Sequence, residues 1–198
     1  DSLVKHNSLK IPFNFPNFFL NNFFLKLLSK IYFLKNLKFK ERIVELKKYF
    51  YPLDNMENWN KIYGVLGFVQ IQILLRNQNA AINLKKIILF FQKKNQVSFV
   101  STLKKMGKKN KNLLSFPDNG YTITFDVKNN ANLVIFLYEL EKILKKMNAK
   151  FYLTKDALMT KEYFQMNCSN ISKFIRYKKI YDPKFKFTSY QSKRLSIT

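Results

Sequence analysis

The stretch GFVQIQILL, residues 67–75, decides the fold, because its residue types and their alternation are typical of a β-strand. Gln70 and Gln72 are two residues apart, so on a strand both amides lie on one face. The apolar residues between and beside them lie on the other face. A half-buried strand of this kind needs further strands and helices to cover its apolar side.

The sequence that follows this strand predicts a repeated order of strands and helices. Apolar spacing predicts helices over residues 80–94 and 131–147, and β-forming residues predict strands over 97–106, 121–127 and 150–154. A polar loop, residues 108–119, separates the second and third strands. We therefore expect an α+β fold: a ferredoxin-like βαββαβ antiparallel sheet with helices on one face. Residues 160–166 and 169–180 are expected to form further helices, followed by a basic tail.

The N-terminal third differs in composition from this repeat. We expect residues 1–64 to form an extension with connector helices and residues 65–198 to form the domain with the sheet. Residues 17–39 are rich in Phe and Leu, but lysines and asparagines interrupt the run, so an amphipathic helix is expected rather than a membrane span. Such a helix either packs against another domain or lies on a membrane surface.

The chain is strongly positively charged, and it contains few residues of the types used in metal binding and nucleophilic catalysis. It has 198 residues with 36 Lys and Arg against 12 Asp and Glu, a net charge of +24. This charge points to nucleic acid or an anionic membrane, although AT-rich coding also produces abundant Lys, Asn, Ile and Phe. Cys168 and His6 each stand alone, so we expect no disulfide, no metal site and no Cys/His or Ser/His catalytic pair within the chain.

Two predicted strands present polar faces to the same sheet. Thr122, Thr124 and Asp126 share one face of the strand 121–127, and Gln70 and Gln72 share one face of the first strand. Amides, hydroxyls and a carboxylate together suit a polyhydroxylated ligand such as a sugar. An ordinary solvated sheet face is the alternative interpretation.

Lysines at two places are candidates for binding an anion. Lys155 follows the last predicted strand, where it is placed to meet an anion or a reduced flavin; a surface lysine is the alternative. A second group surrounds Gly107 and is a possible phosphate cradle or a solvated loop, and it comprises Lys104, Lys105, Lys108, Lys109 and Lys111.

A series of short motifs carries a family resemblance over residues 10–197. The motifs are YPLD at 51–54, WNKIYG at 59–64, GFVQIQ at 67–72, LKKMG at 103–107, LSFPDNGYTITFD at 114–126, YLTKD at 152–156 and DPKF at 182–185. This series resembles the decaprenylphosphoryl-ribose 2′-oxidase family of FAD-linked oxidoreductases, in the vanillyl-alcohol-oxidase superfamily. The chain is similar to the C-terminal, substrate-binding part of these enzymes.

The resemblance implies a reaction, a cofactor and partners. Family members hold FAD in an N-terminal domain and oxidise the 2′-hydroxyl of a polyprenyl-phosphate-linked ribose, and a partner short-chain reductase completes the conversion to arabinose. The chain begins at Asp1 and has no glycine-rich nucleotide motif, so we expect an FAD-binding domain upstream and no activity from this part alone. We expect a location in the cytoplasm or at the cytoplasmic membrane, where an anionic surface is a possible partner.

The resemblance also assigns roles to single residues. Lys155 matches the family's active-site lysine beside the flavin, and Tyr152 matches a tyrosine that contacts FAD. The substrate pocket is expected to contain Gln70, Gln72, Lys104, Thr124 and Asp126. Thr124 stands where some actinobacterial members carry a reactive cysteine, so covalent capture by a thiol is not expected there.

Three departures from the family pattern leave the exact substrate open. Leu158 stands in place of an Arg, Asn167-Cys168 in place of a Tyr-Pro pair, and Tyr190 in place of an acidic residue. The alternatives are therefore a sugar-1,4-lactone oxidase of the same superfamily, or a basic module that binds nucleic acid or a membrane surface. Nucleic acid is not expected as a partner, because the lysines are dispersed and the aromatic residues mostly follow core-like periods.

Overall fold

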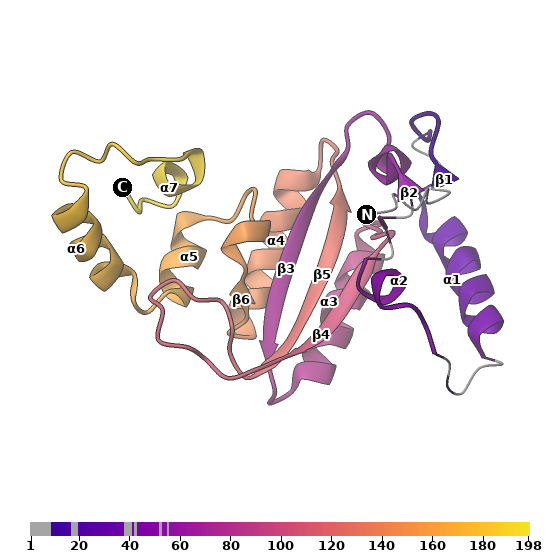
Figure 1. The fold of residues 1–198 in the computed structure, drawn as a ribbon, viewed down its shortest axis with the longest axis horizontal. Helices are drawn as coiled ribbons and strands as arrows, with labels where there is room; N and C mark the ends of the chain where they lie inside the picture. The colour runs from indigo at the N-terminus through magenta and orange to yellow at the C-terminus, as the bar shows by residue number, and fades with distance from the viewer. Residues whose placement is uncertain (1–8, 17–19, 38–40, 42, 52, 55) are drawn as a thin grey trace, which may run out of the picture.

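The computed structural model describes residues 9–16, 20–37, 41, 43–51, 53, 54 and 56–198. Its centre is a four-stranded sheet made of β3 (Phe68–Arg76), β4 (Ser101–Met106), β5 (Gly120–Lys128) and β6 (Lys150–Phe151). The strand order is β4-β5-β3-β6, and each neighbouring pair is antiparallel (Figure 1). This order, with one helix after β3 and one after β5, confirms the predicted α+β fold.

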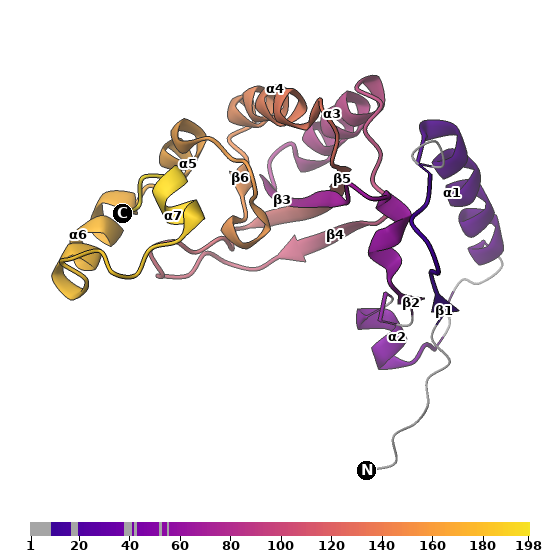
Figure 2. The ribbon, with the colours of Figure 1, turned by 90° about the horizontal axis from the view of Figure 1, so that it is seen from above.

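Helices α3 (Ala80–Lys93) and α4 (Leu133–Lys146) lie side by side on one face of the sheet (Figure 2). The apolar residues of β3 and β5 point toward them and form the main core. Aromatic rings join the layers: Phe91 stacks on Phe125 with ring centroids 4.4 Å apart, and Phe136 meets Phe91 edge-on. No helix of the described part lies over the middle of the opposite face (Figure 2).

Two strands are shorter than the sequence predicts. The second begins at Ser101 rather than at residue 97, because the hydroxyl of Ser98 accepts the backbone N–H of Asp126 in place of a ladder carbonyl. Val97 is instead buried in a second, N-terminal cluster. The fourth strand has only Lys150–Phe151 and is followed by a 3-10 helix, Leu153–Lys155.

The N-terminal part packs against one end of the sheet. It contains β1 (Leu9–Lys10), α1 (Asn22–Asn36), α2 (Leu46–Phe50), β2 (Met56–Glu57) and a 3-10 helix, Trp59–Tyr63. β1 pairs with β2 in parallel. Ile62 and Tyr63 are buried in the N-terminal cluster, together with Ile11, Leu20 and Val97.

Helix α1 confirms the amphipathic helix predicted for this region. The side chain of Asn21 caps it by accepting from the N–H of Phe24 at 2.8 Å, and none of its residues is buried. No helix among the described residues is long and apolar enough to cross a membrane. The ends of the predicted helix, together with His6 and Pro52 of the YPLD motif, lie outside the described residues.

The C-terminal part contains α5 (Lys161–Asn167), α6 (Ile171–Tyr181) and α7 (Tyr190–Arg194). The expected basic tail was wrong in one respect, because α7 and the residues after it return to the sheet. Leu195 and Ile197 are buried in the main core, and apolar burial of this kind fixes the segment. The domain boundary at residue 64 stays a prediction.

Candidate functional site

The strand register brings the predicted polar residues together on the open face of the sheet. β3 and β5 place Gln70 opposite Asp126 and Gln72 opposite Thr124. The amide Nε2 of Gln70 donates to Asp126 Oδ1 at 2.7 Å, and Nε2 of Gln72 donates to Thr122 Oγ1 at 3.3 Å. Directly opposite residues of an antiparallel pair share a face, so all five side chains lie on the side away from α3 and α4.

Asp126 is the buried carboxyl group of this face, with 1% of the residue exposed. Besides Gln70, its carboxylate accepts from the hydroxyl of Tyr63 at 3.1 Å. Burial raises the pKa of Asp126, whereas the hydrogen bonds from Gln70 and Tyr63 and the positive charge of Lys155 act in the opposite direction. The carboxyl is thus held in place by specific partners, and burial is the larger influence on its proton affinity.

Tyr63 connects this face to the N-terminal cluster. Its hydroxyl donates to Asp126 and accepts the backbone N–H of Phe99 at 3.2 Å. Burial, followed by the charge of Asp126, raises the pKa of Tyr63, so the phenol keeps its proton. Ser98 completes the surroundings by accepting the N–H of Asp126 at 2.9 Å.

Tyr152 and Lys155 lie at the β6 edge of the same face. The N–H of Tyr152 donates to the carbonyl of Gln72 at 2.9 Å, which continues the ladder and places Tyr152 opposite Gln72. The ring of Phe116 stacks on Tyr152 with centroids 4.7 Å apart. Lys155 ends the 3-10 helix that follows, its side chain is partly buried, and its charge reaches Asp126.

The C-terminal segment holds the turn that carries Lys155. Gln191 Nε2 donates to the carbonyl of Leu153 at 2.7 Å and to Asp156 Oδ2 at 3.0 Å. Arg194 forms an ion pair with the same carboxylate, with Nη2 and Oδ2 2.5 Å apart. The side chain of Asp156 is 1% exposed, so this pair is a strong constraint on the turn.

Of the two lysines of the basic cluster that lie on strand β4, only Lys104 is on the polar face of the sheet. It lies on the edge strand β4 opposite Thr122, and its side chain is exposed. Lys105 is opposite Tyr121 and therefore lies on the other face. Lys109 lies farther along the loop, beside a cavity that also contains Lys150.

Sequence reasoning missed Tyr63, Ser98, Gln191 and Arg194. Tyr63, the tyrosine of WNKIYG, resembles an ordinary core aromatic residue in the sequence. No local pattern shows that its hydroxyl donates to a carboxylate on β5. Gln191 and Arg194 stand in a segment that reads as a basic tail, 35 and 38 residues from their partner Asp156. The capping pattern at Ser189 was the available signal for a helix there.

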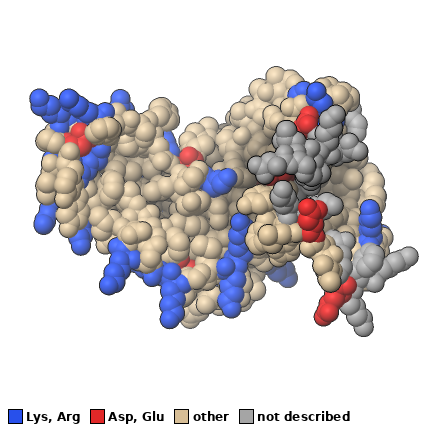
Figure 3. All heavy atoms as spheres, viewed as in Figure 1, with Lys and Arg blue, Asp and Glu red and all other residues tan. Residues whose placement is uncertain are grey.

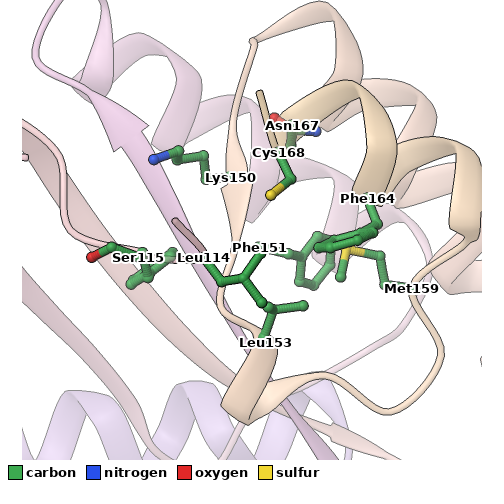
Figure 4. A pocket seen from close by; sticks show the side chains of 10 residues that line it. Leu114, Ser115, Lys150, Phe151, Leu153, Met159, Phe164, Asn167 and Cys168 are labelled. Carbon is green, nitrogen blue, oxygen red and sulfur yellow. The ribbon is translucent and has the colours of Figure 1, made fainter. Parts of the chain in front are cut away.

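None of the cavities lined by the described residues alone includes Gln70, Gln72 or Asp126. The small hollow in Figure 4, about 40 Å³, is lined mainly by apolar side chains from the β6 edge and α5, and it is too small for a sugar. A larger apolar groove of about 870 Å³ lies between α1 and residues 99 and 100. Among the described residues, no cluster of His, Cys, Asp and Glu could hold a metal ion.

The fold and this face define a ferredoxin-like α+β domain with hydrogen-bonded polar side chains on the sheet face opposite α3 and α4. The chain is 30% identical over 189 residues to the decaprenylphosphoryl-β-D-ribose oxidase of Mycolicibacterium smegmatis. This match covers 96% of the chain and 41% of the relative, and it confirms the resemblance carried by the motifs. The chain therefore spans about two-fifths of the length of the curated relative it matches. No family model matches the sequence.

Proposed function

We propose that the chain is the substrate-binding part of an FAD-dependent oxidoreductase that oxidises a sugar hydroxyl, the 2′-hydroxyl of a polyprenylphosphoryl ribose. The observation that carries the proposal is the open polar face, where Gln70 donates to Asp126 and Gln72 donates to Thr122, within electrostatic reach of Lys155. The relative in M. smegmatis is named as an oxidase of such a sugar and matches 96% of the chain.

The orientation of the two glutamines suits a hydroxylated substrate. Each amide nitrogen donates within the sheet, Gln70 to Asp126 and Gln72 to Thr122. The carbonyl oxygen of each amide is then offered to a hydroxyl donor of the ligand. Because the partners are fixed by the strand register, these acceptors are preorganised and need little ordering on binding.

The residues at the β6 edge fit one end of a flavin. Tyr152, whose ring stacks on Phe116, and Lys155, at the end of the 3-10 helix that follows it, both lie at the border of the open face. When bound, FAD supplies the acceptor for the hydride that leaves the sugar carbon. Lys155 would orient the reacting hydroxyl and stabilise negative charge at this place, and Tyr152 would pack against the ring system. In this proposal the remainder of the cofactor is bound by an upstream domain.

Asp126 has a positioning role in this scheme. Its carboxylate accepts hydrogen bonds from Gln70 and Tyr63 and lies below the face rather than on it. It therefore fixes the amide of Gln70 and lies within electrostatic reach of Lys155. Thr124 and Lys104, on β5 and β4, extend the face for contacts with the sugar and its substituents.

The distribution of charge supports a sugar site over a nucleic-acid module. Figure 3 shows the open face of the sheet, where most Lys and Arg side chains lie along the lower margin and at the C-terminal end, and a single blue group lies near the middle. A nucleic-acid groove needs a continuous basic track with exposed aromatic side chains.

A partner reductase is also part of the proposal. The oxidation gives a ketone, and this ketone must be reduced again to give the epimer.

Helix α1 is proposed to bind an anionic membrane surface, where a polyprenyl substrate resides. Lys26, Lys30 and Lys35 are exposed on a helix without acidic residues, and large apolar side chains such as Phe23 and Ile31 are exposed beside them. Flotation with vesicles containing anionic phospholipid should retain the protein, and Lys26→Glu with Lys30→Glu should release it. Equal flotation with neutral vesicles would contradict the electrostatic part.

The experiment that tests the oxidase proposal uses the full-length protein. We expect bound flavin in the purified protein and bleaching of its absorbance by a soluble farnesylphosphoryl ribose without oxygen. Lys155→Ala should keep the flavin and slow bleaching by about 100-fold, because one preorganised charge is removed. Lys105→Ala, on the other sheet face, is the matched control and should bleach at the normal rate. A full-length protein without flavin would overturn the proposal.

A further inference from the structure

A cavity of about 140 Å³ lies at the β6 edge of the sheet, separate from the residues assigned above. Its walls come from five places: the end of β3, the loop between β4 and β5, the turn between α4 and β6, the start of β6, and the junction of α5 and α6. Lys150, Asn167, Cys168 and Ser115 also line the small hollow of Figure 4, where Lys150 comes from β6 and the others from the surrounding segments. The larger cavity can hold a small anion with water but not a polyprenyl chain.

The walls of this cavity carry an excess of positive charge. Arg76, Lys109 and Lys150 line it, and Asp118 is the only carboxylate among the described residues that do so. Asp118 lies 3.6 Å from Lys150, and only 14% of the Lys150 side chain is exposed. One carboxylate does not balance three cations, so the cavity keeps a net positive charge.

The pKa of Lys150 reflects the same excess of positive charge. Burial lowers the pKa of Lys150, Asp118 raises it, and the charges of Lys109 and Arg76 lower it again. The two other cations are therefore near enough to repel Lys150, although they come from distant parts of the chain. A bound anion would relieve this repulsion.

The uncharged groups of the wall are hydrogen-bond donors and acceptors of the kind that bind oxyanions. Asn148, Asn167 and Ser169 line the cavity, as does Asn170 at the N-cap of α6. The side chain of Asn170 makes no capping hydrogen bond, and the first turn of α6 has no acidic residue. The positive end of this eleven-residue helix therefore adds to the three cations.

We propose that this cavity binds a phosphate group, either of a phosphorylated sugar substrate or of free inorganic phosphate. Lys150 is opposite Leu74 on β3, two residues along from the position at which Tyr152 is opposite Gln72. Residues two positions apart on a strand are about 7 Å apart on the same face, so Lys150 and Tyr152 are separated by about this distance. A substrate that carries its phosphate next to the sugar ring could span it. The assignment to the substrate rests on the proposed function; the phosphate site itself does not.

The test measures phosphate binding to the full-length protein by calorimetry, at an ionic strength kept constant with sodium chloride. Wild-type protein should bind inorganic phosphate at one saturable site. Arg76→Gln with Lys109→Gln changes two exposed side chains and should weaken binding by about tenfold or more, because two charge-assisted contacts are lost. Lys145→Gln with Lys146→Gln on α4 removes the same charge elsewhere and should bind as wild type does.

A second variant makes the result independent of damage to the fold. Asp118→Asn removes the opposing carboxylate and should tighten phosphate binding by a few-fold. No saturable binding in the wild type, or equal weakening in the cavity variant and the α4 control, would overturn the proposal.

The source of the phosphate is decided with farnesylphosphoryl ribose. If the substrate supplies it, Arg76→Gln with Lys109→Gln should raise KM about tenfold with kcat unchanged, because the contact is remote from the reacting carbon. An unchanged KM with lost phosphate binding would assign the site to free phosphate. If the protein binds phosphate but oxidises no sugar, the phosphate site is supported and only the proposed function is refuted.

Discussion

The two faces of the central sheet are built from alternating residues of the same strands, and they differ in what completes them. On the covered face, α3 and α4 bury β3 and β5 in a continuous apolar core. On the open face, a buried carboxylate accepts from the amide of Gln70 and the hydroxyl of Tyr63, and the amide of Gln72 donates to a threonine hydroxyl. Apolar burial on the covered face stabilises the fold. On the open face, burial of the carboxyl group is destabilising, but polar groups stay available for a ligand.

Truncation of a core residue should have the largest effect and would test whether stability resides on the covered face. Leu140 on α4 is fully buried, so Leu140→Ala should lower the free energy of unfolding by about 4 kcal/mol. Denaturant titration of the protein measures this change. Val134 on the same helix is 65% exposed, and Val134→Ala should cost less than about 0.5 kcal/mol. Similar losses in both variants would contradict the comparison.

The second effect tests the border of the open face, where α7 holds the turn of Lys155. Arg194→Gln leaves Asp156 buried without its ion-pair partner and should cost about 2–3 kcal/mol. The loss is moderated because Gln191 and the N–H of Met159 still donate to Asp156. Lys193→Gln, an exposed neighbour, serves as the control in the same thermal unfolding series. An unchanged melting temperature for Arg194→Gln would show that α7 does not hold the turn.

The third effect is a pH dependence to which the open face should contribute through Asp126. Burial raises the pKa of Asp126 above its ordinary value of 3.8, so the folded state binds the proton more tightly than the unfolded state. Stability should therefore fall as the pH rises from the ordinary range of an aspartate through the raised pKa. Asp126→Asn should remove this fall, because the side chain no longer titrates.

The pH effect needs a comparison, because a second buried acid acts in the same direction. Burial also raises the pKa of Glu141, which accepts hydrogen bonds from Thr160. Unfolding curves measured at several pH values for wild type, Asp126→Asn and Glu141→Gln separate the two contributions. If the slope stays the same in Asp126→Asn, the carboxyl of Asp126 is not the group responsible.

The fold was largely predictable from the sequence, since the period of two in residues 67–75 and 121–127 sets both the strands and their faces. The polar faces that carry Gln70 and Asp126 followed from this period, but the direct pairing of the two residues did not, because the strand register was not readable from the sequence. Tyr63, Ser98 and Arg194 were not predictable, because each acts on a residue at least 28 positions away in the chain. Local patterns carry no information about such contacts.

The smallest effect should come from the half-buried polar groups of the open face. Gln72 is half-buried and donates one long hydrogen bond, so Gln72→Ala should change the free energy of unfolding by about 0.5 kcal/mol. The same variant should raise KM for farnesylphosphoryl ribose about tenfold, if this face binds the sugar. A large loss of stability without any change in KM would assign Gln72 to the scaffold instead.

The contact between Trp59 and Tyr63 gives this molecule an intrinsic optical reporter. Trp59 is the single tryptophan of the chain, and its ring meets that of Tyr63 edge-on with centroids 6.4 Å apart. Tyr63 in turn donates to Asp126 beneath the polar face. Ultraviolet emission of the unlabelled protein should therefore shift when that face is filled, which would allow ligands to be screened without dyes.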